Sequence, residues 1–277
     1  MGTRRRRRAR AGPPDVRTGR PRTAYGGGLP AGGIRARPGG IRGPPREPSV
    51  ILGQVAVVVP ARNEEDWLPA CLTALDAARA HFLDTVPQVL VSVTVVLDRC
   101  TDRSLSAAQS VPGISIIAGT FGSVGAARDA GVRFALSRSR SLPERTWVAN
   151  TDADTLVPRD WLIRHYRLGS EYQLVLGTVR PTATADNAHL LRSWYQAYTP
   201  GNGHPHVHGA NLGIGGKTYL DLGGFHPLTQ NEDVDLVDRA KAKGVQWTAS
   251  GSIRVTTSSR TEGRVPSGFS TYLRTLT

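Results

Sequence analysis

The sequence of 277 residues has few cysteines, few aromatic residues and no long hydrophobic run. Cys71 and Cys100 are too few for a disulfide framework, and neither lies in a zinc-type spacing, which favours a reducing compartment. The basic N-terminal residues are not followed by an apolar segment, which excludes a secretory signal. The longest uncharged stretch, residues 104–127, is interrupted by glycine and proline and is typical of strand and loop. We therefore expect a cytoplasmic protein without a transmembrane segment.

Acidic residues are scarce in one region only. Residues 1–47 contain 13 arginines but only Asp15 and Glu47 as acids, a net charge of +11. The remaining residues contain 22 basic and 20 acidic groups, so the total charge of +13 comes mostly from the N-terminus. This segment is also rich in glycine and proline, and it buries too little apolar surface to offset the entropy of ordering it. We expect a disordered basic arm at residues 1–48 and a single domain at residues 49–277.

The arm allows three interpretations. It is a solvated tail, or a polybasic contact with an anionic surface such as the inner face of a membrane, or a segment upstream of the true start, because Met1 is the only methionine. The near-neutral domain makes nucleic acid an unlikely partner.

Apolar segments with strand character alternate with segments of helical spacing in the domain. Uninterrupted apolar runs are typical of strands that are covered on both faces, and strands alternating with helices predict a mainly parallel sheet flanked by helices, an α/β fold. The expected strands are residues 54–59, 89–97, 114–117, 147–150, 174–179, 245–248 and 253–256, with 207–214 extended. The expected helices are residues 64–80, 102–110, 124–136, 158–169, 188–198, 217–222 and 232–243.

Polar clusters follow three of these strands, at residues 60–65, 98–102 and 151–154. Ligands of parallel α/β sheets bind at the carboxyl ends of the strands, so we expect the three clusters to share one edge. Asp152 and Asp154 are spaced to face one cation, and hard oxygen ligands suit Mg²⁺ or Mn²⁺. The alternative is a solvated turn whose carboxylates cap the next helix.

Glu232 and Asp233 follow Asn231 at the expected start of a helix. An asparagine N-cap with carboxylates in the first turn is a common way to begin a helix. A carboxylate at this position beside a metal also suits a general base. The residues alone do not choose between the two.

Basic residues offer candidate phosphate contacts in two places. The segment 122–128 presents backbone amides and Arg128 at a helix start, which suits either a phosphate or the plain beginning of a helix. No dinucleotide fingerprint and no Walker loop is present. Arg260 and Arg264, near the C-terminus, would either neutralise phosphate or simply be solvated.

Three histidines alternate at His204, His206 and His208. Alternate residues of an extended segment share a face, but no acidic or cysteine partner lies nearby in the sequence, which disfavours zinc. Contact with a substrate and a polar surface loop are the remaining interpretations.

Six motifs taken in order resemble the GT-A glycosyltransferases of family 2. They are VAVVVPARNEE at 55–65, VVLDRCTD at 95–102, GSVGAARDAG at 122–131, TDAD at 151–154, HGANLGIGGKTYLDLGGF at 208–225 and NEDVDL at 231–236. The resemblance covers about residues 54–264. It implies a GT-A, Rossmann-like nucleotide-diphospho-sugar transferase fold, a nucleotide-sugar donor that is most often a UDP-sugar, a divalent metal, and inversion at the anomeric carbon.

The resemblance also implies roles for individual residues. The base and ribose would lie against Pro60, Arg62, Asn63, Glu64 and Asp98, and Arg128 would lie along the nucleotide. Asp152 would face the ribose or the metal, Asp154 would be the metal ligand, and Asp233, following Glu232, would be the general base. The donor-sugar or acceptor side would be shaped by His208, Asn211, Gly224 and Phe225.

The sequence departs from the family at two points. Residues 99–101, Arg-Cys-Thr, are bulkier than the loop often found there, and no Gln-x-x-Arg-Trp motif follows Asp233, which argues against a processive synthase. A nucleotidyltransferase on a similar sheet, and a non-catalytic binder of anionic surfaces that acts through the arm, are the alternative functions. The sugar and the acceptor are not identified by the residues.

Overall fold

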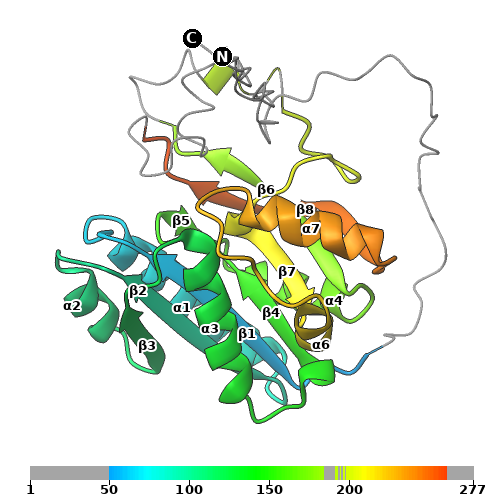
Figure 1. The fold of residues 1–277 in the computed structure, drawn as a ribbon, viewed down its shortest axis with the longest axis horizontal. Helices are drawn as coiled ribbons and strands as arrows, with labels where there is room; N and C mark the ends of the chain where they lie inside the picture. Colours follow the sequence, from blue (N-terminus) through cyan, green and yellow to red (C-terminus); the bar gives the residue numbers. More distant parts are fainter. Residues whose placement is uncertain (1–49, 184–190, 193, 195, 197, 261–277) are drawn as a thin grey trace, which may run out of the picture.

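An eight-stranded sheet runs through the middle of the computed structural model, in the order β3-β2-β1-β4-β7-β6-β8-β5 (Figure 1). The structure describes residues 50–183, 191, 192, 194, 196 and 198–260. The strands are β1 Gln54–Ala61, β2 Leu90–Asp98, β3 Ile114–Gly119, β4 Thr146–Asn150, β5 Thr155–Leu156, β6 Leu174–Pro181, β7 Leu212–Gly215 and β8 Trp247–Thr257. The expected arm at residues 1–48 lies outside the described residues.

Helices cover both faces of the sheet. The α-helices are α1 Leu68–Thr85, α2 Ser104–Gln109, α3 Val124–Ser137, α4 Trp161–Gly169, α6 Gly216–Asp221 and α7 Glu232–Ala242, and the short 3₁₀ turns are η1 Pro143–Arg145 and η2 Gly209–Asn211. Alternate residues of β1 point to opposite cores: Val57 packs with residues of α1 and α4, and Val58 with residues of α3, α6 and α7. The α/β class with helices on both faces is therefore confirmed.

The two halves of the sheet differ in strand direction. The strands β3, β2, β1 and β4 are all parallel. The strand β7 is antiparallel to both β4 and β6, and β5 is antiparallel to β8, so the sheet as a whole is mixed. The two short strands expected at residues 245–248 and 253–256 are one strand, β8, whose register against β6 shifts between Leu176 and Thr178.

Several helix boundaries differ from the sequence prediction. The helix expected from residue 64 begins at Leu68, because the carbonyl of Glu64 accepts hydrogen bonds from the amides of Trp67 and Leu68 and closes a turn first. The helix expected at residues 188–198 falls largely outside the described residues. No helix in the described part of the chain is long and apolar enough to cross a membrane.

The parallel half brings the polar clusters together. Ala61 at the end of β1 pairs with Leu97 of β2, and Val58 pairs with Asn150 at the end of β4. Residues 60–65, 98–102 and 151–154 therefore follow neighbouring strands at one edge of the sheet, as the sequence predicted.

Candidate functional site

The loops after β1 and β2 are bound to each other. Asn63 accepts a hydrogen bond at Oδ1 from the amide of Thr101 at 2.7 Å, and the amide of Glu65 donates to Oδ2 of Asp102 at 2.9 Å. Asn63 and Arg99 both have positive φ, at 53° and 51°, so each loop turns sharply as it leaves its strand. Arg62 is exposed and Pro60 is partly buried beside them. The two loops form one preorganised rim.

Asp98, the last residue of β2, binds the loop between β3 and α3. Its side chain is buried, and Oδ1 accepts hydrogen bonds from the amides of Phe121 at 2.8 Å and Gly122 at 3.3 Å. The carboxylate therefore fixes the loop between β3 and α3.

The pair Asp152 and Asp154 follows β4, and Arg260 lies against it. The Arg260 guanidinium forms an ion pair with Asp154, with 3.0 Å between Nη2 and Oδ2, and donates hydrogen bonds to both oxygens of Glu64 at 2.8 and 2.9 Å. Burial and, less strongly, the charge of Asp152 raise the pKa of Asp154 to about 7 against the opposing charge of Arg260. Arg264 lies outside the described residues.

Arg128 of α3 connects Asp152 to the start of α7. Nε donates to Oε1 of Glu232 at 3.0 Å and Nη2 forms an ion pair with Asp152, while only 3% of the arginine side chain is exposed. Burial alone would lower the pKa of Arg128, but the carboxylates of Asp152, Glu232 and Asp233 raise it, so the side chain is a fixed cation. Arg128 is thus surrounded by protein carboxylates.

Asp233 is held by backbone amides. Oδ2 accepts a hydrogen bond from the amide of Gly209 at 2.6 Å, and Oδ1 accepts one from the amide of Val234 at 2.8 Å. Burial raises the pKa of Asp233 to about 7, the charge of Glu232 raises it further, and Arg128 opposes the increase. A carboxyl that titrates near neutral pH is suited to take up a proton.

Asn231 occupies the N-cap position of α7, with Glu232 and Asp233 in the first turn, but it does not cap the helix with its side chain. Its side chain makes no capping hydrogen bond, and its φ of 59° lies in the left-handed region. The residue serves as the sharp turn that leads into α7, since asparagine tolerates this conformation better than most residues.

The phosphate interpretation of residues 122–128 also fails. Ser123 Oγ caps the amide of Ala126 at 3.1 Å, and the amide of Gly125 donates to the carbonyl of Leu228 at 3.1 Å. A Cβ on Gly125 would lie 2.0 Å from the carbonyl oxygen of His226, so another loop packs directly on this helix start. The segment is the plain beginning of a helix.

The histidines form a stacked cluster that packs against Tyr198. His204 and His208 are buried, and His206 stacks on Tyr198 with ring centroids 4.0 Å apart, which contradicts the surface-loop interpretation. His208 Nε2 lies 3.1 Å from the Tyr198 hydroxyl. Burial lowers the pKa of His206 to about 4 and of His208 to about 3, so both are neutral at physiological pH. No group of three or more His, Cys, Asp or Glu side chains within the described ranges is arranged to hold a metal ion.

The other residues assigned to the sugar side, Asn211, Gly224 and Phe225, are buried. Asn211 is fully buried, donating Nδ2 to the carbonyl of Thr178 at 2.8 Å and accepting from Trp161 Nε1 at 3.0 Å. Phe225 is buried against Tyr219, and Gly224 has a positive φ of 82°. These positions give Asn211 and Phe225 a packing role, and their contact with a sugar stays a prediction.

Gly209 belongs to the motif at residues 208–225, but its contact with Asp233 was not predicted from the sequence. It supplies the amide that binds Asp233, and a Cβ on it would lie 2.6 Å from Nη2 of Arg128. Backbone contacts of this kind leave no residue-type signal beyond the presence of glycine itself.

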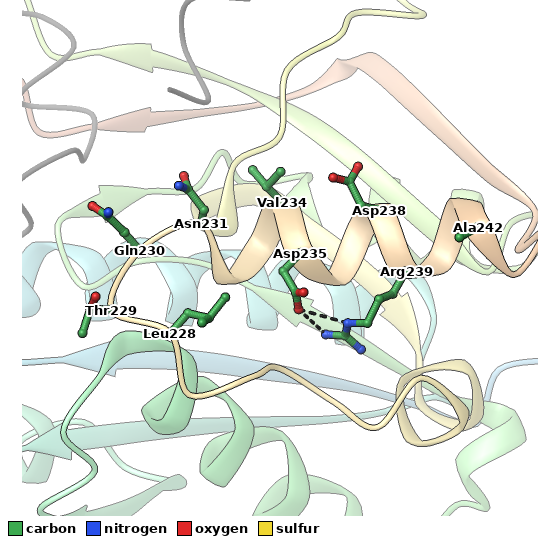
Figure 2. A pocket seen from close by; sticks show the side chains of 9 residues that line it. All are labelled: Leu228, Thr229, Gln230, Asn231, Val234, Asp235, Asp238, Arg239 and Ala242. Carbon is green, nitrogen blue, oxygen red and sulfur yellow. Dashed lines mark hydrogen bonds and ion pairs between the residues drawn. The ribbon is translucent and has the colours of Figure 1, made fainter. Parts of the chain in front are cut away.

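A groove of about 670 Å³ runs along α7 beside the site (Figure 2). Asp235 and Arg239 point to the same side of the helix, where they form an ion pair at 2.7 Å, while Val234 and Asp238 point to the other. The groove is lined by Leu228, Thr229, Gln230, Asn231, Val234, Asp235, Asp238, Arg239 and Ala242, none of which belongs to the carboxylate cluster.

Three solved structures with similar folds are distant in sequence. A mannosyltransferase from Pyrobaculum calidifontis, in complex with GDP-Man and Mn²⁺, is 21% identical with a TM-score of 0.54 over 78% of this chain and 60% of its own. GalNAc-T7 with UDP, GalNAc and Mn²⁺ is 11% identical with a TM-score of 0.55, over 74% of this chain and 44% of its own. S. aureus TarS is 16% identical with a TM-score of 0.53, over 74% of this chain and 36% of its own.

The chain thus spans 60% or less of the length of these three structures, and the likeness shows the fold. A comparison with curated proteins gave no match. The family model described as Glycosyl transferase family 2 matches residues 56–205, more than half of the chain. With the mixed sheet flanked by helices, this match shows that the chain belongs to glycosyltransferase family 2 and has the GT-A fold.

Proposed function

We propose that this chain is a metal-dependent, non-processive glycosyltransferase that moves a sugar from a nucleotide-diphospho-sugar, a UDP-sugar in the first instance, to an acceptor hydroxyl with inversion. The observation that carries the proposal is the arrangement of carboxylates around Arg128. One guanidinium joins Asp152, after β4, to Glu232, at the start of α7. A cation site and a general base are thereby held next to each other.

The carboxylates after β4 fit a divalent metal. Asp152 and Asp154 supply hard oxygen donors two residues apart after β4, and a cation would offset their charge. We assign Mg²⁺ or Mn²⁺ to these two residues, in line with the Mn²⁺ in the similar structures. When bound, the metal would offset the charge that develops on the departing diphosphate.

The remaining residues have assigned parts in the same reaction. The rim formed by Pro60, Arg62, Asn63 and the loop above Asp98 receives the base and ribose. Glu64 binds Arg260 in the structure, and we assign it to positioning that arginine. We assign Arg260 to the diphosphate, and Arg264, which lies outside the described residues, stays a candidate for the same contact.

Asp233 acts as the general base. Its carboxylate, fixed by the amides of Gly209 and Val234, takes the proton from the acceptor hydroxyl as that oxygen attacks the anomeric carbon. Glu232 neutralises Arg128 beside it, and His208, directly before Gly209, lies on the acceptor side. One base and one in-line displacement are sufficient for inversion. We assign the protein to the cytoplasm, with the arm at the inner face of the membrane.

The substitutions Asp233→Asn and Asp154→Ala test this assignment. We expect Asp233→Asn to keep donor binding and to lose about 10²- to 10⁴-fold in turnover, because it removes only the base. We expect Asp154→Ala to abolish metal-dependent donor binding. Binding is measured by thermal shift with a panel of nucleotide-sugars and Mn²⁺, and turnover by release of nucleoside diphosphate.

Asp238→Asn is the matched control on the same helix, because Asp238 is exposed and lies in the groove outside the carboxylate cluster. Its turnover should equal that of the wild type. Near-normal transfer by Asp233→Asn would show that the base is another residue.

A further inference from the structure

Arg260 is shared between two carboxylates that come from different strand ends. Glu64 follows β1 and binds both terminal nitrogens of the guanidinium, whereas Asp154 follows β4 and accepts one contact at 3.0 Å. Bidentate arginine–carboxylate pairs are the stronger and better oriented type. Glu64 is therefore the main anchor of Arg260, and Asp154 is the weaker partner.

The backbone places Arg260 there through the pairing of β5 with β8. Thr155 pairs with Thr257 at the end of β8, and the amide of Ser258 donates to the carbonyl of Asp154 at 3.0 Å. The amide of Arg260 then donates to Ser258 Oγ at 3.2 Å. The start of the C-terminal segment is thus fastened to the loop that carries Asp154.

Arg260 is in contact with solvent. Its side chain is 27% exposed, and the Asp154 side chain is 14% exposed. Water that reaches Arg260 screens its ion pairs, so its contact with Asp154 is easier to exchange than the contacts of the buried Arg128.

We propose that Arg260 is a positioning residue that holds Asp154 in place of a divalent cation, releases it when the cation binds, and stays beside the site through Glu64. The inference rests on the proposed function, because it takes Asp154 as a metal ligand. A guanidinium and a metal ion beside the same carboxylate repel each other, so a cation on Asp154 weakens the contact of that carboxylate with the partly exposed Arg260. Arg260 remains within reach of a diphosphate anion because Glu64 still binds it.

This exchange predicts effects of opposite sign in one variant. Without Arg260, Asp154 has no competing cation, and Mn²⁺ alone should bind more tightly. A nucleoside diphosphate should bind more weakly in the presence of Mn²⁺, because a cation beside the anion is lost. A residue that only maintains the structure would weaken both.

The experiment titrates Mn²⁺ into the full chain and follows the free ion by electron paramagnetic resonance. We expect Arg260→Ala to lower the Kd for Mn²⁺ about tenfold, which is a modest share of the repulsion between two close cations near a protein surface. Arg260→Lys keeps the charge without the bidentate geometry and should give an intermediate Kd. At saturating Mn²⁺, we expect Arg260→Ala to raise the Kd for UDP, or for GDP if that binds better, severalfold.

Arg180→Ala is the matched control. Arg180 lies on the neighbouring strand β6, is exposed, and donates to Thr256 Oγ1 at 2.8 Å without contacting a carboxylate of the site. Arg180→Ala removes one positive charge, as Arg260→Ala does, so any general electrostatic effect on Mn²⁺ binding appears in both variants. We expect its Kd for Mn²⁺ to change less than about twofold.

Asp154→Ala separates the inference from the proposed function. If Asp154→Ala weakens Mn²⁺ binding and Arg260→Ala does not tighten it relative to Arg180→Ala, the exchange is overturned and the metal site stands. If Asp154→Ala leaves the Kd for Mn²⁺ unchanged, or if no variant binds Mn²⁺, both are overturned. Circular dichroism of each variant verifies the fold, and Arg260→Lys provides the same comparison if Arg260→Ala does not fold.

Discussion

Two arginines connect the acidic pair after β4 to acids elsewhere in the chain, and they differ in burial. Arg128 pairs Asp152 with Glu232 and exposes 3% of its side chain. Arg260 pairs Asp154 with Glu64 and exposes 27%. The residues that each arginine connects are far apart in sequence, so both ion pairs depend on the tertiary fold.

The difference in burial separates a fixed ion pair from an exchangeable one. A buried charge cannot lose its partner without leaving an uncompensated charge in a medium of low dielectric constant. A partly exposed charge is compensated by water when its partner leaves. We infer that Arg128 sets the geometry of the site, whereas Arg260 responds to what binds there.

The largest expected effect is on stability, from Arg128→Ala. Removing this side chain leaves the buried Glu232 carboxylate without its ion pair, and we expect a loss of about 3 to 5 kcal/mol in the free energy of unfolding. Arg260→Ala should cost less, because water reaches Arg260 and partly compensates the carboxylates that it leaves. Urea denaturation of both variants without metal measures the difference.

Arg133→Ala is the control on the same helix, since Arg133 is half-exposed and pairs with Asp129 one turn away. It should cost about 0.5 kcal/mol. Equal losses for Arg128→Ala and Arg260→Ala would remove the distinction between the two ion pairs.

A smaller effect is expected from Gly209→Ala. The added Cβ would lie 2.6 Å from Nη2 and 3.0 Å from Cζ of Arg128, which cannot move because it is buried and paired on two sides. We expect a loss of about 1 to 3 kcal/mol by urea denaturation, the usual cost of overpacking. Gly201→Ala, where no atom lies within 4 Å of the added Cβ, should be near neutral. If Gly209→Ala is also neutral, the guanidinium is less fixed than its burial indicates.

The smallest expected effect is the pH dependence of metal binding at Asp154, the partner of the partly exposed Arg260. The pKa of Asp154 is raised to about 7, so its carboxyl is increasingly protonated as the pH falls below 7, and a protonated carboxyl does not bind a cation. Metal affinity should therefore rise with pH, by about tenfold per unit below the pKa, and level off above it. The thermal shift caused by Mg²⁺ should be larger at pH 7.5 than at pH 5.5. Asp154→Asn removes the titrating group, and a pH dependence that persists in this variant would assign the effect to another residue.

The parallel half of the fold follows from local sequence. Val55–Val59 of β1 is buried on both faces, and such a strand must be apolar at every position, which is a pattern that can be recognised without the structure. The polar residues directly after β1, β2 and β4 then fall at one edge, because parallel strands align their carboxyl ends. Asp152 and Asp154 were singled out in this way, and Asp233 by its place at an expected helix start, together with the family resemblance.

The other half depends on contacts between distant residues. The strand β7 is only four residues long, and its antiparallel pairing with β4 and β6 has no local signature. The strand β5 has two residues and exists because β8 lies beside it. The irregular register between β6 and β8 made one strand look like two in the sequence.

Sequence alone established which chemical groups are available: a carboxylate pair after a buried strand, a second acidic pair at a helix start, and a nearly neutral domain behind a basic arm. Only the tertiary structure assigned the partners of those groups. Arg128 is buried between Asp152 and Glu232, and Arg260, near the C-terminus, binds Glu64 and Asp154. The physical reason is that residue type follows from local chemistry, whereas an ion pair requires two charges to meet in space, and the packing of the sheet and helices determines which ones meet.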